Sequence, residues 1–140
     1  MPGEENKALV RRYFEDFAST GNLSVADEIV AAEHVEGVKQ LITRLHTAFP
    51  DFHMAIEDQI AEGEKVVTRF TASGTHQGIW QSPIGTLEPT GKRFQHEGIR
   101  IFRIVDGKLV ETWGGADALS QLQQLGVLHA LVAQHDEARK

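Results

Sequence analysis

The first third of the chain has the hydrophobic spacing of amphipathic helices. Apolar side chains recur every three or four residues and predict a helix over about Glu4–Thr20, ended by Gly21–Asn22; they are Leu9, Val10, Tyr13, Phe14 and Phe17. A second, short helix is predicted next, with Ser24 as its N-cap and Asp27 three residues later. A third is predicted over about Val38–Ala48, stopped by Pro50–Asp51.

The middle of the chain changes to the two-residue alternation of strands. Phe52, Met54 and Ile56 alternate with polar residues, and the segments 66–75 and 94–105 are rich in β-branched and aromatic residues. The intervening segment, 79–92, holds Pro83, Gly85, Pro89 and Gly91, which predicts a loop.

A tight hairpin is predicted at Asp106–Gly107, because a type I′ turn needs positive φ at both central positions. The return strand is expected over 108–113, with Gly114–Gly115 breaking it. Asp117 then opens a helix that ends or kinks at Gly126, and 127–138 is expected to form a last helix or a frayed tail. Helices followed by consecutive antiparallel strands indicate an α+β fold. A curved sheet covered by helices on one face would leave a cavity suited to a small ligand.

Composition narrows the class of protein. A chain of 140 residues with 41% hydrophobic and 24% charged residues is expected to form one globular domain over residues 1–140. The absence of cysteine excludes disulfides and thiolate catalysis. The net charge of −6, with basic residues scattered, argues against a nucleic-acid partner. We expect no membrane span, no signal peptide and a cytoplasmic location.

Three side chains are candidates for acid/base chemistry: His96, Arg100 and Asp117. His96 and Arg100 are four residues apart on a strand and therefore share a face. If that face lines the cavity, His96 could move a proton and Arg100 could hold an enolate or carboxylate oxygen. The alternative is that this face points to solvent. Asp117 is either the N-cap of its helix or a buried carboxylate that acts as acid or base.

Six further side chains are candidates for the wall of a ligand cavity: Tyr13, Phe17, His76, Trp80, Phe102 and Trp113. Four of them also have an ordinary explanation. Tyr13 lies in an apolar stripe and could simply pack in the core. His76 could be a loop histidine, Trp80 either a lid or a packing residue, and Trp113 part of the core or of an interface.

No metal site is expected. Glu57, Asp58 and Glu62 lie on a strand and a turn, without a histidine at ligand spacing, which indicates a solvated edge. The remaining histidines show no convergent pattern; they are His34, His46, His53, His129 and His135.

The segment 97–127, EGIRIFRIVDGKLVETWGGADALSQLQQLGV, resembles the C-terminal signature of SnoaL-like polyketide cyclases, within the nuclear-transport-factor-two-like superfamily. Four more segments match in the same order: 6–30, GVKQLI at 37–42, GTHQG at 74–78 and PTGKR at 89–93. The resemblance implies a cone-shaped α+β barrel, with N-terminal helices packed on a strongly curved, mainly antiparallel sheet. It also implies a cavity inside the cone, usually a homodimer, and no metal or cofactor.

The resemblance further implies acid/base chemistry beside a carbonyl, which closes a ring by an intramolecular aldol step. The position that matches the catalytic aspartate of the cyclases is Gly114, and the position that matches their assisting histidine is Arg100. The loop that follows the second helix in the family is reduced here to residues 31–36.

Three functions remain open from the sequence. The first is a cofactor-independent cyclase or isomerase acting on a small apolar or aromatic molecule. The second is a non-catalytic protein that binds such a molecule, as Gly114 suggests. The third is an enzyme similar to limonene epoxide hydrolase, which needs an Asp–Arg–Asp set that Arg69 or Arg100 with Asp117 could supply only in part.

Overall fold

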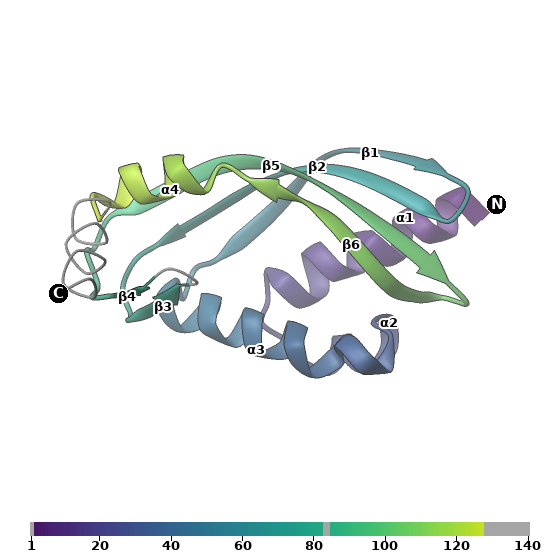
Figure 1. The fold of residues 1–140 in the computed structure, drawn as a ribbon, viewed down its shortest axis with the longest axis horizontal. Helices are drawn as coiled ribbons and strands as arrows, with labels where there is room; N and C mark the ends of the chain where they lie inside the picture. Colours follow the sequence, from purple (N-terminus) through teal and green to yellow (C-terminus); the bar gives the residue numbers. More distant parts are fainter. Residues whose placement is uncertain (1, 83–84, 128–140) are drawn as a thin grey trace, which may run out of the picture.

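The computed structural model describes residues 2–82 and 85–127. The N-terminal half contains the predicted helices: α1 (Pro2–Arg12), α2 (Ser24–Ile29) and α3 (Ala32–Ala48), with a π-helical stretch, η1 (Tyr13–Ala18), continuing α1 (Figure 1). Two details differ from the prediction. Ser24 is the first helical residue of α2 and not its cap, and α3 begins at Ala32, so most of the expected loop remnant forms its first turns.

The main sheet has four strands, β1 (His53–Glu62), β2 (Lys65–Thr75), β5 (Arg93–Val105) and β6 (Lys108–Ala116), in the order β1-β2-β5-β6. Every neighbouring pair is antiparallel. The segment predicted as a loop instead contains a small antiparallel ribbon of β3 (Trp80–Ser82) and β4 (Gly85–Leu87).

The β5–β6 turn is the predicted one, since Asp106 and Gly107 have φ of 51° and 72°. The predicted break at Gly114–Gly115 is wrong, because β6 continues through both glycines and pairs them with Arg100 and Ile99 of β5. The hydrogen bonds from β5 hold both glycines in the extended strand conformation, which their local sequence does not favour.

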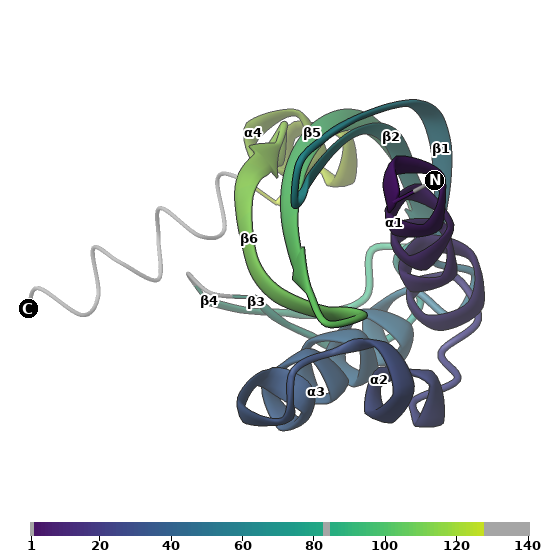
Figure 2. The same cartoon turned by 90° about the vertical axis from the view of Figure 1, so that its right-hand side faces the viewer.

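The sheet curls around its helices into a cone, as Figure 2 shows most clearly. α1 lies beneath β1 and β2 (Figure 1). α3 lies at the bottom of the cone, below the lower part of the curved β6 (Figure 2). Val10 near the end of α1, and Phe14 and Phe17 in η1, are buried against the sheet. The Phe14 ring lies 5.3 Å from that of Phe70 and 5.8 Å from that of Phe102, so aromatic side chains join helix and sheet.

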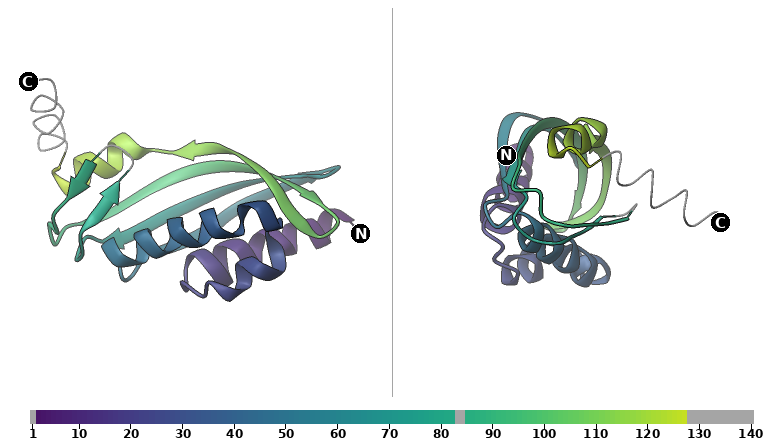
Figure 3. Two further views of the ribbon diagram at one scale, coloured as in Figure 1. Left: turned by 60° about the horizontal axis from the view of Figure 1, so that its bottom comes forward. Right: turned by 90° about the vertical axis from the view of Figure 1, so that its left-hand side faces the viewer.

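α4 (Ala118–Leu125) follows β6 and lies at the same end of the molecule as the β3–β4 ribbon (Figure 3). Asp117 caps it as predicted, with its Oδ1 accepting a hydrogen bond from the Ser120 amide at 2.9 Å. Gly126 ends it in the left-handed conformation, with φ of 71°. The last helix predicted over 127–138 lies, apart from Val127, outside the described residues. Among the described helices, none has the length and apolar character needed to cross a membrane.

Candidate functional site

The concave face of β5 carries the even-numbered side chains of the strand. Phe94, Phe102 and Ile104 are buried, whereas Ile99 on the other face is 53% exposed. His96 and Arg100 are therefore on the inner face, as one of the two sequence alternatives expected. At the inward position between them, Gly98 admits the ring of Phe70, because a Cβ there would lie 2.5 Å from Phe70 Cζ.

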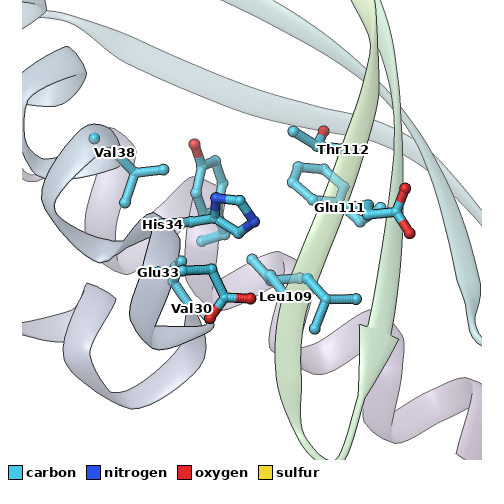
Figure 4. A pocket seen from close by; sticks show the side chains of 11 residues that line it. Val30, Glu33, His34, Val38, Leu109, Glu111 and Thr112 are labelled. Carbon is cyan, nitrogen blue, oxygen red and sulfur yellow. The ribbon is translucent and has the colours of Figure 1, made fainter.

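A cavity of about 450 Å³ lies between the start of α3 and the strand β6. Its size falls in the range that holds a small organic ligand. The apolar part of its wall comes from Tyr13, Val30, Val38, Phe102, Leu109 and Val110. The polar part comes from Glu33, His34, Glu111 and Thr112, seen in Figure 4. The sequence candidates Tyr13 and Phe102 thus meet in one cavity.

Tyr13 begins the π-helical stretch and packs between helix and sheet. Its ring lies 5.3 Å from that of Phe102 and 5.4 Å from that of Phe17. Burial raises the pKa of the Tyr13 phenol, and the positive charge of Arg100 acts in the opposite direction. The hydroxyl therefore stays protonated near neutral pH and can donate a hydrogen bond to a ligand oxygen.

Arg100 is a half-buried cation that is not itself part of the cavity wall but contacts it through Thr112. One of its nitrogens, Nη1, donates a hydrogen bond to Oγ1 of the lining residue Thr112 at 3.4 Å. Within the described part of the chain, no carboxylate lies at salt-bridge distance from it, whereas Arg69 and Arg103 both have such partners. A guanidinium without an anion partner on a concave face is suited to hold a ligand oxygen that bears negative charge.

Gly114 faces Arg100 directly across the β5–β6 ladder. Its φ is 119°, and a Cβ at this position would collide with the carbonyl oxygen of Ile99. The backbone therefore favours glycine at the position that matches the cyclase aspartate. No aspartate of the described residues lines the cavity, so these residues do not assemble the Asp–Arg–Asp set of the third hypothesis there.

His96 and Asp117 lie further along, towards α4, and do not line this cavity. His96 and Arg100 are four positions apart on the strand, a distance of roughly 13 Å at 3.3 Å per residue. The His96 ring stacks on Phe94, with centroids 5.2 Å apart. Burial lowers the pKa of His96, opposed by the Glu97 backbone and then by Asp117 and Gln121. Its Nδ1 is buried and has no hydrogen-bond partner in the described part of the chain. The structure does not gather the three catalytic candidates into one site.

The other candidates for the wall occupy different places. Phe17 is fully buried in the core. His76 is also fully buried, and its Nδ1 lies 3.2 Å from Thr90 Oγ1. Among the described residues its Nε2 has no hydrogen-bond partner, and burial lowers the pKa of His76, opposed by the backbone of Gly78. Trp80 belongs to β3 and packs edge-on against Phe49 at 5.2 Å, so its indole forms part of the core and not a lid.

The assignment of Trp113 to the cavity is wrong. Its indole is 42% exposed on the convex face of the sheet, where Lys65 Nζ lies 5.5 Å from the ring centroid. Thr112, the preceding residue, faces the cavity instead, because successive side chains of a strand point to opposite sides.

His34 lines the cavity although the sequence pattern did not single it out. Residues 31–36 were predicted as the remnant of a loop, whereas His34 lies in the first turn of α3. Once the helix begins at Ala32, positions 34, 37 and 38 share one face, and all three line the cavity. This helical spacing was the signal that could have found it. The described residues contain no cluster of three or more His, Asp or Glu side chains placed to hold a metal ion.

Solved structures with this arrangement cover most of the chain. TsrD from Streptomyces laurentii is 26% identical with a TM-score of 0.80, over 89% of this chain and 97% of that one. IdmH from Streptomyces antibioticus, described as a candidate polyketide cyclase, is 27% identical with a TM-score of 0.71, over 87% and 99%. AclR from Streptomyces galilaeus, described as a candidate hydroxylase, is 27% identical with a TM-score of 0.73, over 90% and 87%.

A comparison with curated proteins gives no match. The sequence model of the SnoaL-like polyketide cyclases matches residues 8–125, which include the C-terminal part of α1, the whole curved sheet and α4. Because the family model covers the elements that build the cone and its cavity, the chain belongs to the SnoaL-like polyketide cyclase family.

Proposed function

We propose that the protein binds a small, largely apolar molecule with a carbonyl or phenolic oxygen in the cavity between α3 and β6, and catalyses acid/base cyclisation or isomerisation of it. The observation that carries this proposal is Arg100, a half-buried cation that has no carboxylate partner among the described residues and donates a hydrogen bond to the lining residue Thr112. Its positive charge also acts on the phenol of Tyr13. Membership of the family supports the reaction class.

The chemistry follows from where charge develops. When a proton leaves the carbon next to a carbonyl, negative charge moves to the carbonyl oxygen. The guanidinium of Arg100 and the protonated hydroxyl of Tyr13 would hold that oxygen and stabilise the enolate more than the ketone. Val38, Phe102 and Leu109 supply apolar wall, which excludes water and favours a carbon skeleton over a sugar or nucleotide.

The fluorescent phenol 2-naphthol tests the oxygen-binding pair, since its neutral and ionised forms emit differently. We expect Arg100→Gln to weaken binding of the ionised form by roughly 10- to 100-fold, because a hydrogen bond to a charged group contributes about 1.5–3 kcal/mol. The matched control is Arg69→Gln, whose side chain is exposed and pairs with Glu97 at 3.1 Å. Equal affinity of Arg100→Gln and wild type would refute the site.

A non-catalytic binding protein is the second candidate, and Gly114 favours it, because no aspartate side chain stands opposite Arg100. Incubation with linear aromatic polyketones, followed by mass spectrometry and NMR of the recovered compound, separates the two. A bound compound returned unchanged supports the binding protein. A ring-closed product supports the enzyme.

We also propose a homodimer formed through the convex face of the sheet. The strand registers place Ile60, Val67, Ile101 and Trp113 in one row across all four strands. Ile60 is 63% exposed and Trp113 42%. An apolar row of this kind suits burial against a second copy. Light scattering should give twice the 15.5 kDa chain mass and a lower mass for Ile60→Glu; a monomeric wild type at high concentration would contradict the proposal.

A further inference from the structure

His34 projects into the cavity from α3. In Figure 4 its imidazole points away from the helix and towards β6, between Val38 on one side and Leu109 on the other. The side chain is exposed, and its backbone amide bonds the Ala31 carbonyl at 2.9 Å as part of the first helical turn. Within the described residues no hydrogen bond or ion pair holds the ring, so it is free to meet a ligand.

The proposed reaction needs a side chain that exchanges a proton, and few of the described residues that line the cavity have a titratable side chain. The cyclase aspartate position is Gly114, which has no side chain. The titratable groups that line the cavity with His34 are Tyr13, Glu33 and Glu111. Burial raises the pKa of Tyr13, which makes it a hydrogen-bond donor and not a base. Glu111 is held by Arg103 at 2.6 Å, and Glu33 is exposed, as His34 is.

An imidazole is the side chain best matched to proton transfer near neutral pH, because it both accepts and donates a proton there. We propose that His34 is the catalytic acid and base of this cavity, taking a proton from the carbon beside the ligand's carbonyl group. This inference rests on the proposed function, and it assigns the proton transfer to α3 and not to the β5–β6 sheet.

In an aldol ring closure, the C–H bond beside the carbonyl group breaks and its proton moves to a ring nitrogen of His34. The electron pair of that bond forms the enolate, whose oxygen is held by Arg100 and Tyr13. The enolate carbon then bonds to a second carbonyl carbon of the same molecule. The new alkoxide oxygen takes the proton back from His34, which returns to its starting state.

Hydrogen–deuterium exchange of 2-tetralone, followed by NMR in D₂O, measures the first half of this step. This bicyclic ketone has acidic hydrogens beside its carbonyl. We expect His34→Gln to lower the catalysed exchange rate at least 100-fold, in line with the usual contribution of general acid/base catalysis. Its affinity for 2-naphthol should stay within twofold of wild type. The control is His53→Gln, an exposed histidine at the start of β1 outside the cavity.

Two readouts separate catalysis from a structural role. Added imidazole should restore exchange to His34→Ala, where it can enter the vacated space. The acid limb of the pH–rate profile should disappear in His34→Gln and persist in Glu33→Gln. A His34→Gln protein with the wild-type rate and limb would overturn the proposal. So would a wild type that binds 2-naphthol without accelerating exchange, whereas loss of the Arg100 effect on naphthol binding would overturn the binding site itself.

Discussion

Gly37 offers a way to close the cavity without weakening the fold. It lies within α3, lines the cavity, and would have no atom within 4 Å of an added Cβ. Glycine in a helix interior costs about 0.5–1 kcal/mol relative to alanine, because it loses more backbone freedom on folding. Gly37→Ala should therefore raise the free energy of unfolding by about that amount, which corresponds to a Tm increase of roughly 2–4 °C.

Gly37→Phe extends the same reasoning to function. Its ring would occupy part of the 450 Å³ cavity, while the helix would be at least as stable as in wild type, because phenylalanine lies between alanine and glycine in helix propensity. We expect its affinity for 2-naphthol to fall at least tenfold, or about 1.4 kcal/mol. Gln40→Phe, exposed on the same helix and outside this cavity, should bind as wild type does.

Urea unfolding and fluorescence titration of the three variants provide the two measurements. Higher or unchanged stability combined with lost binding cannot be attributed to misfolding. Undiminished binding by Gly37→Phe would show that the ligand occupies another place. A less stable Gly37→Ala would show that the space around this position is not open.

Three further predictions concern stability. Gly114→Ala should lose at least about 2 kcal/mol, because φ is positive and the Cβ meets backbone, whereas Gly115→Ala, with open space, should be nearly neutral in urea unfolding. Burial lowers the pKa of His76, so below about pH 6.5 the unfolded chain binds more protons than the folded one. The free energy of unfolding should therefore fall as the pH drops through this range, and it should fall less steeply in His76→Phe. Urea midpoints of both proteins at pH 5 and pH 7.5 measure the difference. Asp117→Ala should cost about 1 kcal/mol through loss of the cap, and Asp117→Asn much less; equal midpoints for the two would argue against capping.

The sequence was sufficient where local chemistry decides the conformation. The turn at Asp106–Gly107, the end of α4 at Gly126 and the cap at Asp117 follow from residues that tolerate positive φ or bond nearby amides. The helical stripe through Phe14 and Phe17 likewise predicted its own burial.

The local sequence was not enough to predict the conformation of segments whose hydrogen-bond or packing partner is a strand or helix distant in the chain. Gly114–Gly115 stay in β6 because β5 holds them, and residues 80–82 and 85–87 pair as two strands although the composition of this segment is that of a loop. The start of α3 was placed too late, since residues 32–36, all exposed except the partly buried Val35, carry little hydrophobic pattern.

The sequence by itself determined the fold class, the family resemblance and two of the cavity's aromatic residues, Tyr13 and Phe102. Only the tertiary structure decided which side chains share a site. A period of two shows that His96 and Arg100 lie on one face, but the curvature of the sheet decides that this face is the inner one. The same curvature brings His34, from a helix more than sixty residues earlier in the chain, opposite β6. Such convergence depends on long-range packing, which no local pattern contains.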